Sequence, residues 1–132
     1  MAYLVDTDWL IDHLDDLPEA RTLLDELASD GIAISIITFM EAYQGVMRSP
    51  QPQEAQAKLQ SLLETIPVLP LSLEVAQRCA LLREQLRGQG KRVNQRALDL
   101  IIAATALEHD LTLVTRNIND YSDIADLKLY QA

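Results

Sequence analysis

Cysteine, glycine and basic charge are all scarce in this sequence of 132 residues. Its single cysteine, Cys79, excludes an internal disulfide and a cysteine-rich zinc site, and it favours a reducing, cytoplasmic compartment. The 4 glycines form no glycine-rich loop after a predicted strand, so neither an ATP site nor a dinucleotide site is expected. The longest apolar run, residues 100–107, is too short to cross a bilayer, and the acidic N-terminal segment is unlike a signal peptide.

Acidic residues outnumber basic ones by 20 to 11, which gives a net charge of −9. A protein of this charge does not hold nucleic acid by bulk attraction. Residues 78–96 nevertheless contain six of the 11 basic residues and only one acid, Glu84. Such a segment is typical either of a solvated helix face or of a local docking site for phosphates.

Short apolar runs alternate with amphipathic segments along the whole chain. Buried strands are predicted at residues 3–5, 32–36, 66–69, 111–114 and 127–130. Helices are predicted after a cap at Thr7 or Asp8, over 19–29, from a cap at Thr38 to about Met47, and over 53–64, 73–87 and 96–109. This alternation predicts one domain, residues 1–132, built as a three-layer α/β/α sandwich around a parallel sheet of about five strands.

Acidic and polar side chains follow several of the predicted strands. Asp6 ends the first strand and Glu41 lies on the helix after the second, while Asp99 lies near the start of the apolar 96–109 helix. Asn117 and Asp120 follow the fourth strand. The carboxyl ends of parallel strands share one edge of a sheet, so these side chains are expected to converge there. Converging carboxylates repel one another, and a divalent cation such as Mg²⁺ or Mn²⁺ relieves that repulsion.

Each of these acids also has a purely structural interpretation. Asp6 can end a strand or cap a helix, Glu41 can be an exposed helix residue, and Asp120 can be a turn residue. Asp99 is harder to explain in this way, because an unpaired charge inside an apolar helix costs several kcal/mol. Its simplest structural role is to cap its own helix. The two histidines lack the spacing of zinc ligands.

Four segments, in this order, resemble a PIN domain, and they are most similar to the VapC-type ribonuclease toxins of toxin–antitoxin pairs. The segments are residues 5–11, Glu41 after residues 35–38, residues 99–106, and residues 113–117 with Asp120 and Tyr121. The resemblance covers essentially the whole chain. It implies a Mg²⁺- or Mn²⁺-dependent endoribonuclease that hydrolyses RNA phosphodiester bonds. It also implies a cognate antitoxin as partner and a homodimer, with a candidate interface on the helices around Phe39, Tyr43 and Val46 and over residues 53–64.

The resemblance also implies a role for each matched residue. Asp6, Glu41 and Asp99 fall on the acidic positions of the family, with Asp6 and Asp99 expected to hold the metal and Glu41 to orient water. Asn117 stands where many relatives carry an acid, so Asp120 is expected to complete the site. Thr115 and Asn117 are expected to contact metal-bound water or phosphate, whereas Thr7 and Asp8 are expected to order the turn after the first strand. Four basic side chains are expected to hold the RNA backbone, namely Lys91, Arg92, Arg96 and Arg116.

Other functions stay open from the sequence. A HAD-like aspartyl phosphatase would use Asp6-Thr7-Asp8 as its opening motif, but it also needs an acidic pair after a later strand, where this chain has Thr115-Arg116-Asn117. A receiver domain needs an aspartate at the end of the third strand, and residues 66–71 contain none. A catalytically silent PIN module that only binds a partner would be expected to have lost acids that this chain keeps.

Overall fold

Four short parallel strands form the middle layer of the computed structural model, which describes residues 1–131. In spatial order they are β3 (Val68–Leu69), β2 (Ile32–Ser35), β1 (Tyr3–Val5) and β4 (Thr112–Val114). β1 pairs with β2 on one side and with β4 on the other. The chain forms β2 and β3 on one side of β1 and then crosses over to form β4 on the other side of β1. In such parallel sheets, ligand sites lie beyond the carboxyl ends of the strands, at the point where the strand order reverses.

The fifth strand predicted at residues 127–130 is reduced to a single parallel bridge between Leu113 and Leu129. The N–H of Leu113 donates to the carbonyl of Lys128 at 2.8 Å, and the N–H of Tyr130 donates to the carbonyl of Leu113 at 2.9 Å. This segment lies beside β4 but exchanges bonds with only one of its residues, so the described sheet has four strands rather than about five.

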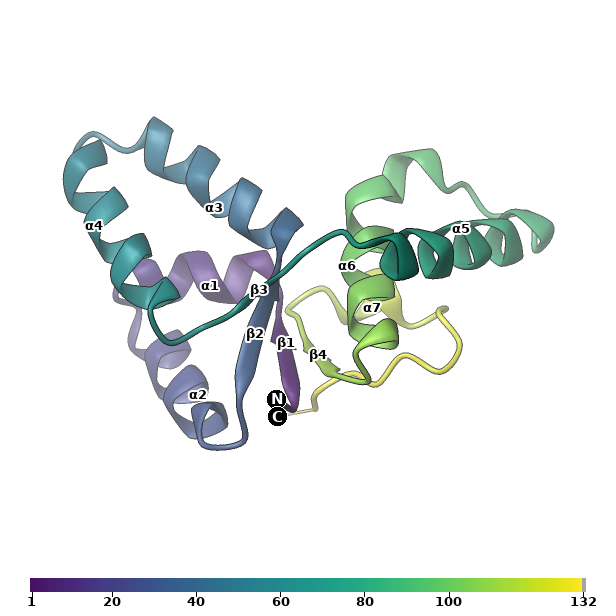
Figure 1. Cartoon of the computed structure of the whole chain (residues 1–132), viewed down its shortest axis with the longest axis horizontal. Helices are drawn as coiled ribbons and strands as arrows, with labels where there is room; N and C mark the ends of the chain where they lie inside the picture. Colours follow the sequence, from purple (N-terminus) through teal and green to yellow (C-terminus); the bar gives the residue numbers. More distant parts are fainter. Residues whose placement is uncertain (132) are drawn as a thin grey trace.

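Helices cover both faces of this sheet (Figure 1), which confirms the predicted three-layer α/β/α architecture. One face carries α1 (Thr7–Leu14), α2 (Pro18–Ala28), α3 (Ile36–Arg48) and α4 (Pro52–Leu63). The other face carries α5 (Leu73–Gly88), a single 3₁₀ turn (Asn94–Arg96), α6 (Ala97–Glu108) and the short α7 (Ile118–Tyr121).

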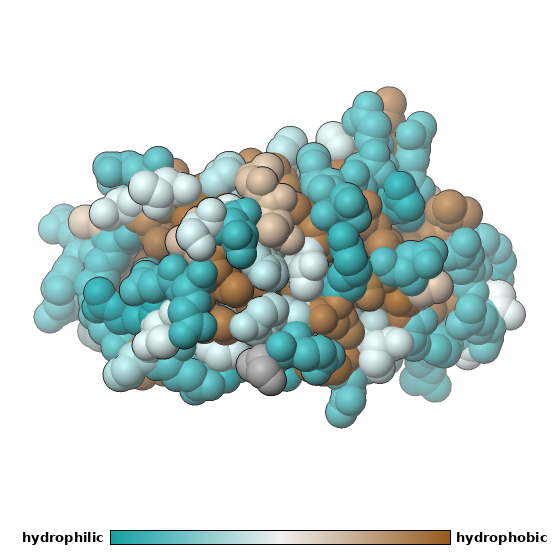
Figure 2. Space-filling model, turned by 90° about the horizontal axis from the view of Figure 1, so that it is seen from below, coloured by the Kyte–Doolittle hydropathy of each residue, from teal (hydrophilic) through white to brown (hydrophobic). Residues whose placement is uncertain are grey.

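Alternate strand residues contribute to two hydrophobic cores. Leu4 and Ala33 pack with residues of α5 and α6, whereas Val5 and Ile34 pack with residues of α1 to α4. The strands are apolar at successive positions because both faces of the sheet are covered. On the face seen in Figure 2, hydrophilic side chains cover most of the surface and apolar patches lie between them. Within the described part of the chain, no helix is long and apolar enough to cross a membrane.

Two helices begin earlier than the sequence predicts, and both starts affect the site. The cap of α1 is Asp6, whose Oδ1 accepts a hydrogen bond of 2.8 Å from the N–H of Thr7. The cap of α3 is Ser35, whose Oγ accepts a hydrogen bond of 3.1 Å from the N–H of Thr38. The predictions of Thr7 or Asp8 and of Thr38 as caps were wrong, because the extended backbone at a strand end already has the conformation of an N-cap. Each helix therefore starts without a loop.

Candidate active site

Asp6 lies at the C-terminal end of the central strand, and its carboxylate is held by two elements at once. The residue is 5% exposed, and its Oδ2 accepts a hydrogen bond of 2.7 Å from the Thr115 hydroxyl, in addition to the bond from Thr7 at Oδ1. Thr115 follows β4 directly, and the N–H of Asp6 donates to the carbonyl of Val114 at 2.9 Å. The neighbouring ends of β1 and β4 thus fix the orientation of this carboxylate.

Burial raises the pKa of Asp6 above its ordinary value, although the hydrogen bonds from Thr115 and Thr7 act in the opposite direction. The charges of Asp99 and Asp8 raise the pKa further. Burial and like charges both disfavour the free carboxylate, and a nearby cation relieves both.

A chain of hydroxyl groups connects this strand end with Glu41 on α3. Thr7 Oγ1 donates to Glu41 Oε1 at 2.6 Å and lies 3.2 Å from Thr38 Oγ1, which lies 3.4 Å from Ser35 Oγ. Ser35 and Thr38 are both fully buried. Glu41 was predicted as a site residue and Thr38 only as a helix cap, although the spacing of three residues between them places both on one helix face.

Asp99 approaches the same place from the first turn of α6. Burial raises its pKa, the facing Tyr121 hydroxyl lowers it, and the charge of Asp120 raises it again. The N-cap of α6 is Arg96, so Asp99 does not cap its own helix. The simplest structural explanation of this acid is therefore excluded.

The rim of the site carries Asp8, Asn117 and Asp120, which are all exposed. Asn117 Nδ2 donates to Asp8 Oδ2 at 3.2 Å, while its backbone N–H donates to the Thr115 hydroxyl oxygen at 3.0 Å. Asp120 lies on α7, a four-residue helix too short for its periodicity to predict. Two hollows of the surface, of about 360 Å³ and about 430 Å³, are lined by other residues.

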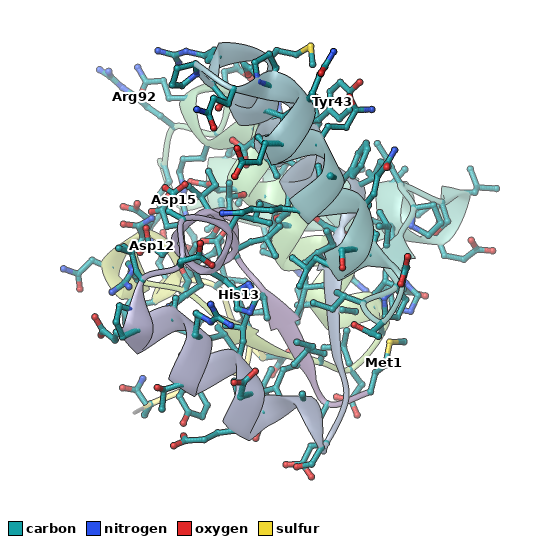
Figure 3. All side chains as sticks on the ribbon, turned by 90° about the vertical axis from the view of Figure 1, so that its left-hand side faces the viewer. Met1, Asp12, His13, Asp15, Tyr43 and Arg92 are labelled. Carbon is teal, nitrogen blue, oxygen red and sulfur yellow. The ribbon has the colours of Figure 1, made fainter. Side chains whose placement is uncertain are left out.

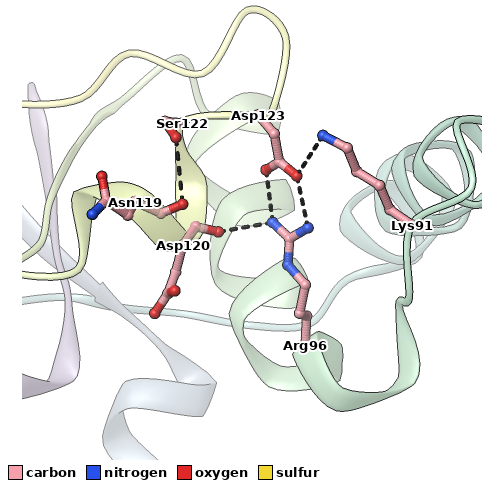
Figure 4. A network of polar contacts seen from close by, with 6 residues as sticks. All are labelled: Lys91, Arg96, Asn119, Asp120, Ser122 and Asp123. Atoms are coloured by element: carbon pink, nitrogen blue, oxygen red, sulfur yellow. Dashed lines mark hydrogen bonds and ion pairs between the residues drawn. The ribbon is translucent and has the colours of Figure 1, made fainter.

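Lys91 and Arg96 pair with Asp123 rather than standing free (Figure 4). Arg96 Nη1 and Nη2 donate to the two carboxylate oxygens at 2.9 and 2.8 Å, and Lys91 Nζ donates to Asp123 Oδ2 at 2.9 Å. Arg96 Nη2 also donates to the backbone carbonyl of Asp120 at 2.7 Å, while the side chain of Asp120 points away from it. These contacts tie α7 to the start of α6.

The other two predicted RNA contacts differ in their surroundings. Arg116 forms an ion pair of 2.9 Å with Asp12, and its guanidinium carbon lies 3.7 Å from the centre of the Trp9 ring. Arg92 extends outward at the edge of the molecule (Figure 3) and forms no ion pair with any residue in 1–131. Three of the four predicted RNA contacts therefore pair with acids in the fold, namely Lys91, Arg96 and Arg116. Arg92 is the least neutralised of the four.

The donor atoms at the site fit a hard divalent cation. Within residues 1–131, no three histidine, cysteine or acidic side chains lie close enough together to enclose a metal ion. Mg²⁺, however, is commonly held by one or two carboxylates and completed by water and substrate phosphate. The charge of Asp99 raises the pKa of Asp6, and the carboxylates of these two residues are the type of oxygen ligand that such a cation takes.

Residues 3–127 match the PIN domain family over nearly the full length of the chain. The chain belongs to the PIN domain family. Ribonuclease VapC2 of Rickettsia felis is 30% identical to this PIN domain over 131 residues, which cover 98% of the chain and 96% of that protein. The tRNA(fMet)-specific endonuclease VapC of Shigella flexneri is 25% identical over 128 residues, covering 97% and 96%.

Solved structures agree with this assignment. The crystal structure of VapBC2 from Rickettsia felis, bound to a DNA fragment from the promoter, matches this PIN domain with a TM-score of 0.87 and 30% identity, covering 98% of each chain. FitAcB from Neisseria gonorrhoeae matches with a TM-score of 0.82 and 28% identity, covering 98% of this chain and 96% of that one. The predicted resemblance to the VapC-type branch is thereby confirmed.

We predict that Asp123→Asn destabilises this PIN domain by about 1–3 kcal/mol at neutral pH, because the variant loses charge-assisted bonds to Arg96 and Lys91. Those bonds lower the pKa of Asp123 from 3.8 to about 2. The native carboxylate therefore contributes stability above pH 3.8, and this contribution is lost as the pH falls through about 2. Thermal unfolding between neutral and acid pH measures the difference. Asp30→Asn, at an exposed acid without an ion pair among residues 1–131, is the control, and a difference that persists at the lowest pH contradicts the prediction.

A second prediction concerns the charge of Asp99 without metal. Asp99→Asn keeps the shape of the side chain and removes a charge that burial and Asp120 disfavour. We expect the variant to melt at a higher temperature than the native chain in the presence of chelator at pH 7, as scanning calorimetry would measure. A lower melting temperature would mean that the carboxylate stabilises the fold.

Proposed function

We propose that this PIN domain is a VapC-type endoribonuclease that hydrolyses RNA phosphodiester bonds with the aid of Mg²⁺ or Mn²⁺. Two observations support the proposal: burial and the charge of Asp99 raise the pKa of Asp6, and the Thr7 hydroxyl beside Asp6 donates a hydrogen bond of 2.6 Å to Glu41. The names of the relatives, which are ribonucleases and a tRNA-specific endonuclease, support the same activity.

In this proposal Asp6 and Asp99 hold the cation, and the remaining polar groups act on water and phosphate. The bound cation neutralises charge on the phosphate and lowers the pKa of a nearby water molecule. Glu41 has one oxygen engaged by Thr7, which leaves Oε2 to orient the attacking water and to accept its proton. Thr115 keeps Asp6 oriented, and Asn117 and Asp120 contact the substrate or its water from the exposed rim.

The RNA backbone is proposed to contact the basic side chains near this rim. Arg92 has no acidic partner among residues 1–131, so its charge is available to a phosphate. Arg116 presents a guanidinium that Trp9 and Asp12 hold in place. Lys91 and Arg96 contribute to the same positive field, although each shares its charge with Asp123.

A cognate antitoxin is the second proposed partner. Structures of relatives are described as VapBC complexes and as a toxin–antitoxin complex from Klebsiella pneumoniae. A cluster of poorly neutralised carboxylates attracts arginine, which pairs with carboxylates through two parallel hydrogen bonds. We therefore propose that a basic side chain of the antitoxin enters the acidic site and competes with the cation. A toxin of this type acts on RNA in the cytoplasm, where the buried free thiol of Cys79 would stay reduced.

We also propose that two copies of the chain associate through α3. Four apolar side chains of this helix are exposed at spacings of three or four residues, namely Ile36, Met40, Tyr43 and Met47. Tyr43 projects from the helix in Figure 3. This α3 stripe replaces part of the interface expected from the sequence, because Val46 is 4% exposed and Leu59 of α4 is 1% exposed within the monomer. Both are core residues.

The proposed activity predicts cleavage of RNA that depends on a divalent cation. Native protein with Mg²⁺ or Mn²⁺ should cut single-stranded or loop RNA, and chelator should abolish the cut. Asp6→Asn, Glu41→Gln and Asp99→Asn should each lower the rate by about 100-fold or more, because such groups act as a unit. Gel analysis of labelled RNA measures the rate. Glu64→Gln, at an exposed helix end, is the matched control.

Three outcomes would separate this proposal from its alternatives. RNA that is cut equally by the Asp99→Asn protein points to a contaminating nuclease. An intact RNA together with tight binding of the neighbouring gene product identifies a silent PIN module. Phosphate released from a small monoester, without RNA cleavage, identifies a phosphatase. The neighbouring gene product should suppress the native activity when it is added to the same assay.

The dimer is tested by the mass in solution. Light scattering at micromolar concentration should give about twice the 14.8 kDa of the chain. Tyr43→Glu should shift the mass to that of the monomer, because the new charge would be buried in the α3 stripe. Leu17→Glu, at an apolar residue that is 45% exposed away from α3, should leave the dimer intact. A monomeric native protein would remove the proposal.

A further inference from the structure

Tyr121 carries a buried hydroxyl that the fold itself does not use. The residue ends α7, is 1% exposed, and packs in the core formed with α5 and α6. Its hydroxyl is buried and makes no hydrogen bond of ordinary length and angle to any residue in 1–131. An unsatisfied buried polar group costs about 1–3 kcal/mol, and phenylalanine would fill the same space without that cost. Stability alone therefore does not account for a tyrosine at this position.

The surroundings of the hydroxyl make it a hydrogen-bond donor. It faces the carboxylate of Asp99, and the charges of Asp6, Asp99 and Glu41 all act on it. A tyrosine hydroxyl is protonated at neutral pH, since it ordinarily loses its proton only at about pH 10. Ionised carboxylates accept hydrogen bonds and cannot donate them. The protonated hydroxyl of Tyr121 can therefore donate a hydrogen bond to these three carboxylates but cannot accept one from them.

The position of this donor relative to Asp99 is fixed from outside the site. Arg96 lies three residues before Asp99, and its guanidinium holds the carbonyl of Asp120 at 2.7 Å and the carboxylate of Asp123 at 2.8 Å. These two residues flank Tyr121 within three positions along the chain. One side chain from the start of α6 therefore clamps the segment that carries the hydroxyl.

We propose that Tyr121 is a positioning residue for the cation site: when the divalent cation is bound, the Tyr121 hydroxyl donates to one oxygen of Asp99 and leaves the other oxygen to the cation. This inference rests on the function proposed above. In this proposal Tyr121 acts through Asp99 and is not itself a ligand. It acts by restricting the rotation of the Asp99 carboxylate, and the loss of such an outer partner lowers metal affinity by about 10- to 100-fold.

The test compares Tyr121→Phe with the native chain in titrations with Mn²⁺ alone, followed by thermal unfolding and by calorimetric binding. The variant should need about 10-fold or more Mn²⁺ for the same response. Without metal it should be at least as stable as the native chain, because it loses only an unsatisfied hydroxyl. RNA cleavage by the variant should recover when Mn²⁺ is raised to saturation. Tyr130→Phe, whose ring packs against Tyr3, provides the matched control.

The outcomes distinguish this inference from the proposed function. Equal Mn²⁺ affinity in Tyr121→Phe and native protein overturns the positioning role even if both proteins cut RNA. A metal-free variant that is clearly less stable than the native chain also overturns it, because the hydroxyl would then be structural. A native chain that shows no response to Mn²⁺ contradicts the cation site itself, and with it the proposed function.

Discussion

Burial of a carboxylate at the end of the central strand is the constraint on which the rest of this structure depends. Asp6 is kept in place by the backbone of α1 on one oxygen and by the Thr115 hydroxyl on the other. Both bonds require α1 to begin at Thr7 and β4 to lie in its observed register with β1. A shift of one residue in either element would leave the carboxylate buried without partners, at a cost of several kcal/mol. The local geometry and the alignment of the sheet thus depend on each other.

Basic side chains and the acids at the strand ends differ in how far other charges neutralise them. Four of the six basic side chains of residues 78–96 form ion pairs, three of them with acids outside this segment, as Arg78 does with Glu108 and Arg96 does with Asp123. The acids at the strand ends have hydroxyl and backbone donors but few cations near them. The protein therefore pairs most of its positive charges internally and leaves negative charge near the site where a cation is proposed to bind.

The sequence was most informative where a pattern is local. Apolar runs predicted β1 and β2, and Asp6 was correctly predicted to follow the first strand directly. The caps of α1 and α3 were mispredicted by one to three residues, because several neighbouring residues are able to cap and only the backbone decides. The short α7 has too few residues for a period to show.

Long-range contacts could not be predicted from these patterns. Asp123 is 27 residues from Arg96 and 32 residues from Lys91, so the sequence shows three charges without showing that they meet. Tyr121 was given no role of its own from the sequence, because nothing local indicates that its hydroxyl faces Asp99. Residues 127–130 have the apolar pattern of a strand, but the segment forms only a single bridge, to Leu113 of β4. The prediction of a full strand there was therefore wrong.

The absence of a loop between β2 and α3 has a mechanical consequence. α3 starts at the residue after Ser35 and carries both Glu41 and the exposed Met40 next to it in the chain. A helix that follows a strand without a flexible connection moves as a rigid body. A displacement at the α3 stripe therefore also displaces the carboxylate of Glu41. A contact made on that stripe would therefore shift the position of Glu41.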